Sequence, residues 1–244
     1  MSDLKEHKGL LITGICFLSL ILILLSAFFI YTAIYYKADS KALEALASEN
    51  IKIEEHNNFY SFMPDNPKAG IIFYPGAKVD EKAYAPLMLE LTNHNYACFL
   101  VKMPFHLAFF GQNRADQVLE KYSSITEWYM MGHSLGGVVA SGYANSHSQI
   151  SGLILLASYA SVDLSNSDLK VISIYGSNDG VLSLKNYEDS KKNLPSNFWE
   201  YVIEGGNHSG FGNYGHQKKD GSLELEDGMQ INITSCVIDE FFYG

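Results

Sequence analysis

The chain has 244 residues, with 17 basic and 27 acidic side chains, so its formal net charge at pH 7 is −10. This length is enough for one domain, or two small ones, and an apolar fraction of 47% excludes a wholly disordered or fibrous chain. The negative charge argues against nucleic acid as a partner, because binding to phosphates depends on lysine and arginine.

The N-terminal region is strongly apolar. The run from Gly9 to Tyr36 contains no Asp, Glu, Lys or Arg, and about 20 helical residues suffice to cross the hydrocarbon core of a bilayer. Lysines flank the run on both sides, and tyrosines lie at its C-terminal end, where an interfacial aromatic belt is expected. The pattern predicts a tail over residues 1–8, a single-pass transmembrane helix over 9–36 and a stalk or linker over 37–50.

Two other interpretations of the apolar run stay open. A cleaved signal peptide has a shorter apolar region of about 7–15 residues, and Ala38-Asp39-Ser40 offers only a weak cleavage site. A buried core helix at a chain terminus is seldom apolar all round. The flanking lysines give almost no positive-inside bias, although the α-amino group slightly favours an internal N-terminus. On that basis we expect a cell-membrane protein whose main domain lies outside the cytoplasm.

Beyond residue 50, short apolar runs alternate with helical patterns. Strands are predicted over residues 51–53, 59–63, 71–74, 96–101, 128–131, 153–157, 171–175 and 198–203, and the first two strands are expected to form a hairpin. Helices are predicted over residues 81–93, 114–121, 135–145, 184–192 and 227–242. The later strands are continuous apolar runs, as is typical of parallel strands covered on both faces. We therefore expect one α/β domain over residues 51–244, built on a doubly wound, mostly parallel sheet.

Two smaller features of this domain have open interpretations. The segment at 104–112 contains three phenylalanines, which is unusual for a loop, and it is expected either to pack into the core or to cover a pocket or bilayer surface. Of the three cysteines, Cys16 lies in the apolar run. Cys98 and Cys236 are expected as two buried thiols or as one disulfide, and the thiols are favoured.

The sequence G-H-S-L-G at residues 132–136 follows an apolar strand and precedes a helical run. A nucleophile elbow has this context, because its sharp turn exposes a serine at the end of the sheet and a Cβ two positions before or after that serine would clash. Gly132 and Gly136 meet that requirement, so we predict Ser134 as a nucleophile. The alternative is a structural turn with an ordinary serine.

A serine nucleophile needs a base and an acid that orients the base, and on this architecture they follow in the order Ser, Asp or Glu, His. Asp179 follows the 171–175 strand, and His208 follows the 198–203 strand, so we predict these two residues as acid and base. The sequence around Asp179 is also an ordinary turn signal. The rivals for the two roles are His216, Glu204 and Asp163.

The negative charge that develops on the substrate oxygen needs main-chain N–H donors. One donor follows the nucleophile and the other comes from the loop after the third strand, which predicts Leu135 and Ala77, with Lys78 as an alternative for the second. His208 has no second ligand at metal spacing, and the chain has no C-x-x-C, so no zinc site is expected.

These segments resemble the α/β-hydrolase superfamily, especially a small bacterial branch known generically as α/β hydrolases. The resemblance rests on FYPGAKVDEKAYAPL at 73–87, GHSLGG at 132–137, GSNDGV at 176–181 and GGNHSGFGNYGHQKKDG at 205–221. It extends from about residue 51 to the C-terminus. It implies an α/β-hydrolase fold and a carboxylic-ester hydrolase that uses Ser134, Asp179 and His208 without a metal or organic cofactor, and the branch includes members with an N-terminal membrane segment.

The sequence therefore predicts a membrane-anchored serine hydrolase that acts on a small-molecule acyl ester through an acyl-enzyme. An acyltransferase with the same triad and a noncatalytic, membrane-tethered binding protein are the alternatives. Residues 1–41 carry a net charge of +1, so the remainder carries −11. Such a domain is repelled by anionic lipid, which favours a soluble or neutral acyl substrate. The sequence does not indicate an oligomeric state.

Overall fold

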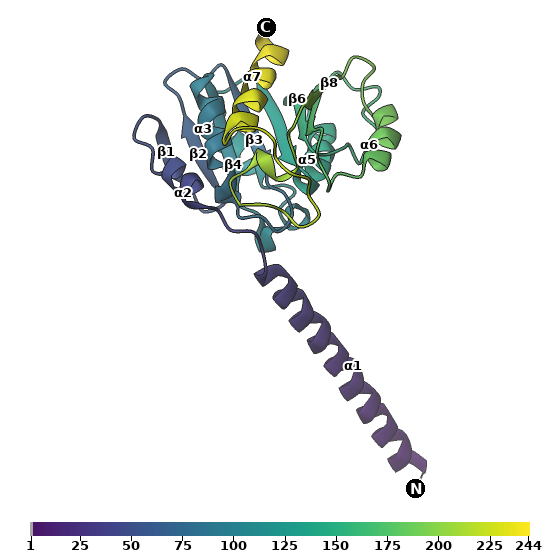
Figure 1. Cartoon of the computed structure of the whole chain (residues 1–244). Coiled ribbons are helices and arrows are strands. Elements are labelled where there is room, and N and C mark those ends of the chain that lie inside the picture. Colours follow the sequence, from purple (N-terminus) through teal and green to yellow (C-terminus); the bar gives the residue numbers. More distant parts are fainter. Residues whose placement is uncertain (1) are drawn as a thin grey trace. The chain divides into compact units, whose positions relative to one another are not determined.

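A computed structural model of the protein describes residues 2–244, which form two compact units that separate after Tyr35 (Figure 1). The first unit is one long helix, α1 (Ser2–Ala33). Its Gly9–Ala33 portion, 25 residues in length, is long and apolar enough to cross a membrane. A signal sequence near the N-terminus can meet the same criterion of length and composition. The helix ends at Ala33, three residues before the predicted end of the transmembrane segment.

The segment predicted as a stalk belongs to the second compact unit. Tyr36 forms a parallel β-bridge with Val79, and a short helix, α2 (Ser40–Leu46), follows. The Asp39 side chain caps α2 by accepting a hydrogen bond from the Ala42 N–H at 2.9 Å. Ala42 is fully buried, because apolar residues of this segment pack on the main core. Residues 36–50 are therefore part of the domain rather than a spacer before it.

The second unit contains an eight-stranded sheet in the order β1-β2-β4-β3-β5-β6-β7-β8. Its strands are β1 (Lys52–Glu55), β2 (Phe59–Met63), β3 (Ala69–Tyr74), β4 (Tyr96–Val101), β5 (Trp128–His133), β6 (Ile150–Leu156), β7 (Lys170–Gly176) and β8 (Trp199–Ile203). β1 and β2 form the predicted antiparallel hairpin, β2 is antiparallel to β4, and all other pairs are parallel. The predicted doubly wound, mostly parallel sheet is confirmed.

Helices cover both faces of the sheet, and α3 and α7 lie side by side on one of them (Figure 1). The helices are α3 (Ala85–Asn93), α4 (Ala115–Lys121), α5 (Leu135–Ser146), α6 (Leu184–Ser190) and α7 (Met229–Tyr243), with short 3-10 turns η1 (Glu81–Tyr84), η2 (Pro104–His106), η3 (Ala108–Phe110), η4 (Lys191–Asn193) and η5 (Ser209–Phe211). The predicted 81–93 helix begins as the η1 turn. Pro86 then occupies the first turn of α3, where its missing N–H leaves no hydrogen bond unmade.

The apolar strands supply two cores, one on each face of the sheet. Along β3, Ile71 and Phe73 belong to one core, whereas Ile72 and Tyr74 belong to the other. Successive side chains of a strand point to opposite faces, so a strand covered on both faces must be apolar throughout. This is the physical reason for the continuous apolar runs in the sequence.

The structure decides between the interpretations left open for the phenylalanine-rich segment and the cysteines. Phe105, Phe109 and Phe110 are exposed rather than packed in the core. Cys98 is buried, but Cys236 is exposed on α7, and both are free thiols. The expectation of two buried thiols is therefore correct for Cys98 and wrong for Cys236.

Candidate active site

Three predicted residues lie where strands end at the carboxyl edge of the parallel sheet. Ser134 joins β5 to α5, Asp179 follows β7, and His208 follows β8. Because these strands are parallel, their carboxyl ends lie along one edge, where open α/β folds place their sites. The sheet thus brings together side chains that are 29 or more residues apart in the sequence.

The turn that carries Ser134 has the strained geometry expected of an elbow. Ser134 has φ 51° and ψ −124°, a conformation that a residue with a Cβ seldom adopts. A Cβ on Gly132 would lie 2.5 Å from the main chain of Gly136 and Gly137, and a Cβ on Gly136 would collide with the carbonyl oxygen of Tyr74. The small residues on either side of the serine are thus required by close contacts between main-chain segments.

Asp179 and His208 form a buried pair. The His208 Nδ1 atom lies 2.9 Å from the Asp179 Oδ2 atom, and each side chain is 1% exposed. The other carboxylate oxygen, Oδ1, accepts hydrogen bonds from the N–H groups of Val181 and Leu182, both at 2.8 Å. These bonds fix the carboxylate, so its remaining oxygen holds the imidazole in one orientation.

Ser134 and His208 line the same cavity, which has a volume of about 210 Å³ and is otherwise walled by Leu135, Val138, Ala157, Ser158, Tyr159, Val181, Leu182 and Ser183. The His208 Nε2 atom is buried and has no hydrogen-bond partner within residues 2–244. With Nδ1 facing a carboxylate, the neutral ring carries its proton there and leaves Nε2 as an acceptor. This lone pair is therefore available to take a proton.

The two predicted main-chain donors differ in what surrounds them. Leu135 is the first residue of α5, where N–H groups have no partner inside the helix, and it lines the cavity beside Ser134. On the loop after β3, the Gly76 N–H donates to the Tyr84 hydroxyl at 3.2 Å and the Lys78 N–H donates to the His106 carbonyl at 2.8 Å. Within residues 2–244 the Ala77 N–H between them has no such partner. Ala77 is not among the residues that line the cavity.

The family model for the alpha/beta hydrolase family matches residues 70–231, which is about two-thirds of the chain. The matched range includes Ser134, Asp179 and His208. The chain belongs to the alpha/beta hydrolase family. Family membership supports hydrolase activity, and it confirms the resemblance to the superfamily seen in the sequence. A search of curated protein sequences gives no match.

Solved structures show the same fold at low sequence identity. TT1662 from Thermus thermophilus has a TM-score of 0.59 at 12% identity, over 80% of this chain and 99% of that one. The esterase domain of a Rhodothermus marinus protein has a TM-score of 0.57 at 12% identity, over 78% of this chain and 97% of that one. A third similar structure is a soluble variant of monoglyceride lipase from Saccharomyces cerevisiae in complex with a substrate analogue. It has a TM-score of 0.54 at 15% identity, over 78% of this chain and 94% of that one. At these identities the likeness concerns the fold alone.

A second histidine of this alpha/beta hydrolase joins three loops of the site. His133, fully buried at the end of β5, has its Nδ1 atom 2.8 Å from the Tyr84 hydroxyl oxygen and its Nε2 atom 3.1 Å from the His208 carbonyl oxygen. Burial, with a smaller effect of neighbouring His208, lowers the pKa of His133 well below its ordinary value. A neutral ring donates from Nε2 and accepts at Nδ1. Each donor in the series of hydrogen bonds from the Gly76 N–H through Tyr84 and His133 to the His208 carbonyl oxygen then has an acceptor.

Sequence reasoning missed this role of His133 and Tyr84, and it also missed Asp220, whose carboxylate accepts the His208 N–H at 3.1 Å. A signal for Asp220 exists in the sequence, since a Lys-Asp-Gly turn follows the histidine within the same glycine-rich segment. For His133 the pattern gives only its place inside the elbow.

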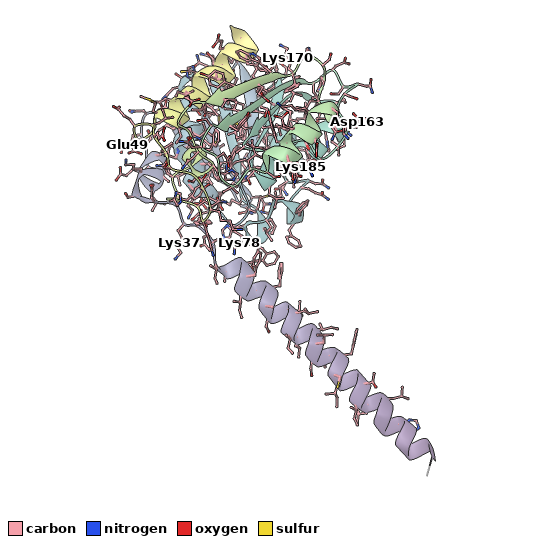
Figure 2. All side chains as sticks on the ribbon, turned by 45° about the vertical axis from the view of Figure 1, so that its right-hand side comes forward. Lys37, Glu49, Lys78, Asp163, Lys170 and Lys185 are labelled. Carbon is pink, nitrogen blue, oxygen red and sulfur yellow. The ribbon has the colours of Figure 1, made fainter. Side chains whose placement is uncertain are left out.

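The rival residues of this hydrolase lie outside the buried pair. His216, Glu204 and Asp163 are all exposed, and Asp163 is at the outer surface of the domain (Figure 2). Among the residues that the structure describes, no group of three or more His, Cys, Asp or Glu side chains is arranged to hold a metal ion.

Proposed function

We propose that this hydrolase is a membrane-anchored serine hydrolase that cleaves an ester-type acyl substrate through an acyl-enzyme on Ser134. One observation carries the proposal. The imidazole of His208 is fixed on one side by Asp179 at 2.9 Å, and its other nitrogen is buried without a hydrogen-bond partner within residues 2–244. Ser134 and His208 line one cavity.

In the first half of the reaction, His208 Nε2 takes the hydroxyl proton of Ser134 while Oγ bonds to the acyl carbon. The N–H group of Leu135, which lines the cavity, stabilises the negative charge that moves onto the substrate oxygen. The Ala77 N–H on the loop after β3 is the second donor that the sequence predicts. The imidazolium, held by the Asp179 carboxylate, gives its proton to the leaving alcohol oxygen as the ester bond breaks. An acyl-serine and a free alcohol result.

In the second half, His208 removes a proton from a water molecule whose oxygen bonds to the acyl carbon. The proton then passes to Ser134 Oγ as the acyl-serine bond breaks, which releases the carboxylic acid and restores the enzyme. Every proton moves between Ser134, His208, water and the substrate.

The comparisons support an ester as the substrate class, because similar structures include an esterase domain and a monoglyceride lipase. The length and hydropathy of α1 support anchoring in the membrane. Because the domain is strongly acidic, we propose a soluble or neutral acyl compound rather than one carried on an anionic lipid surface.

A fluorophosphonate probe tests the proposed nucleophile on the detergent-solubilised full chain. We expect rapid labelling of the wild-type protein and of Ser165→Ala, which replaces an exposed serine away from the cavity. Ser134→Ala should lose both the label and the hydrolysis of a simple ester. Equal labelling of the wild type and Ser134→Ala would contradict the assignment of the nucleophile, and no labelling of either would favour a noncatalytic binding protein.

A further inference from the structure

The acid and the base of the proposed reaction lie on two separate loops, and a third segment joins these loops. The Asp220 Oδ1 atom accepts hydrogen bonds from the His208 N–H at 3.1 Å and from the Gly180 N–H at 3.2 Å. Gly180 is the residue after Asp179. One carboxylate oxygen is thus bonded to the main chain of both loops.

The second oxygen of the same carboxylate strengthens the attachment to the histidine loop. Oδ2 accepts from the Ser209 N–H at 2.7 Å and from the Ser209 hydroxyl at 2.6 Å, while Oδ1 also accepts from the Gly221 N–H at 2.9 Å. The donors are N–H and O–H groups. Among the described side chains no basic group pairs with this carboxylate, so its main partners are the two loops themselves.

The turn around Asp220 packs directly against the turn around Asp179. A Cβ added at Gly180 or at Gly221 would collide with the facing main chain. Two side-chain amides hold the same turn, since Asn207 donates to the Gly221 carbonyl at 2.8 Å and Asn178 donates to the Ser222 carbonyl at 3.1 Å. The close fit leaves little room for Asp220 to move relative to either loop.

The ionised form of Asp220 is favoured in this environment. Partial burial opposes ionisation, but the hydrogen bonds from Ser209, His208 and Gly180 outweigh it and lower the pKa of the carboxyl. A charged acceptor makes stronger hydrogen bonds than a neutral one. The carboxylate therefore holds these N–H and O–H donors more firmly than a neutral side chain would.

Building on the proposed function, we propose that Asp220 is a positioning residue that keeps the main chain of His208 in register with the Asp179 turn. Asp220 is not among the residues that line the cavity, so it acts through His208 rather than on the substrate. Without it the imidazole loses its fixed distance from Asp179 and its place in the cavity that Ser134 also lines. A misplacement of about 1 Å can lower an enzymatic rate about 100-fold.

The test compares Asp220→Ala and Asp220→Asn with Asp239→Asn in the detergent-solubilised full chain. Asp239 is a partly buried carboxylate with several partners, Lys68 and Tyr96 among them, at the opposite edge of the sheet. For ester hydrolysis we expect Asp220→Ala to lower kcat about 10- to 100-fold with little change in KM. The kcat of Asp220→Asn, which has one acceptor oxygen instead of two, should lie between those of Asp220→Ala and the wild type. Asp239→Asn should keep the wild-type kcat.

A second comparison separates positioning from a general loss of structure. If Asp220 acts through His208, then Asp220→Ala should lower the residual rate of His208→Ala by less than about twofold, because effects of residues that act as a unit are not additive. The proposal would be overturned if Asp220→Ala lowered the rate by the same factor in the wild type and in His208→Ala, or if Asp220→Ala kept the wild-type kcat. If the alanine variant does not fold, the asparagine variant is measured in the same way.

Hydrogen–deuterium exchange gives a readout that does not depend on activity. In Asp220→Asn we expect faster exchange confined to the loops at 178–183 and 205–212, whereas Asp239→Asn should leave these loops as in the wild type. Unchanged exchange in both loops would overturn the proposal. If the fluorophosphonate probe labels Ser134→Ala like the wild type, the proposed nucleophile fails, and the exchange data still decide whether Asp220 holds the two loops.

Discussion

The Nε2 atom of His133 lies 3.1 Å from the carbonyl oxygen of His208, so the residue before the proposed nucleophile is hydrogen-bonded to the proposed base. This bond requires a proton on Nε2, which leaves Nδ1 to accept from the Tyr84 hydroxyl. A second proton on the ring would turn Nδ1 from an acceptor into a donor, so the Tyr84 hydroxyl could no longer donate to it. With a neutral His133, the structure thus joins the elbow, the β3 loop and the histidine loop.

The neutral state of His133 predicts a loss of stability in acid. Burial lowers the pKa of His133 well below the ordinary value near 6.5. Below about pH 6.5 the unfolded chain therefore takes up a proton that the folded chain does not, and the free energy of unfolding falls by up to about 1.4 kcal/mol per pH unit from this group. Above that pH the contribution is constant. Urea unfolding between about pH 5 and 8 measures the effect.

The variant His133→Phe isolates this contribution. It removes two buried hydrogen bonds, so at neutral pH we expect it to be less stable than the wild type by about 1–3 kcal/mol. The difference should shrink as the pH falls toward about 5, because the variant has no buried imidazole to resist protonation. A difference that stays constant over this range would show that His133 does not carry the acid sensitivity.

Two glycines of α5 predict opposite effects for the same substitution. Gly136→Ala places a methyl group against the carbonyl oxygen of Tyr74, whereas nothing lies within 4 Å of a Cβ at Gly142. We expect Gly136→Ala to lower the free energy of unfolding by at least about 2 kcal/mol and to slow fluorophosphonate labelling. Gly142→Ala should raise it by about 0.5–1 kcal/mol, because alanine is the better helix former. Thermal unfolding with both variants gives the comparison, and similar effects would contradict the close contact at the elbow.

Much of the fold could be predicted from the sequence because it depends on local patterns. Continuous apolar runs marked the parallel strands, and the glycines at 132 and 136 marked a turn that only small residues permit. The place of Asp179 and His208 at one edge followed from the fact that parallel strands end together.

The contacts of His133 and Asp220 could not be predicted in this way. Each joins loops that are distant in sequence. The Lys-Asp-Gly turn marks the position of Asp220 but not its partners, because every residue except proline offers the same main-chain N–H donor. The supposed stalk shows a related limit. Residues 40–46 form a helix in which Ala42 is buried by tertiary contacts that the composition of the segment does not contain.

Asp179→Asn should abolish most of the activity and leave the binding of the substrate largely intact. The amide can present its N–H₂ group to His208 Nδ1, which then must accept, so the proton moves to Nε2 and the base is lost. By analogy with the effect of this change in other triads, kcat should fall about 10⁴-fold with a small change in KM. Steady-state ester hydrolysis measures both constants. A kcat within about tenfold of the wild type would contradict the role of Asp179 as the orienting acid.

The thiols of the chain offer a test of the side of the membrane that the sequence predicts. Cys236 is exposed on α7, whereas Cys98 is buried and burial raises the pKa of its thiol to about 12. In a Cys16→Ala background, a membrane-impermeant maleimide should therefore react with Cys236 and leave Cys98 unmodified. If the domain lies outside the cytoplasm, intact cells should give nearly the same labelling as lysed cells, and Cys236→Ser should abolish it. Labelling that requires lysis would place the domain inside. Labelled protein found in the medium would show that α1 is a cleaved signal sequence.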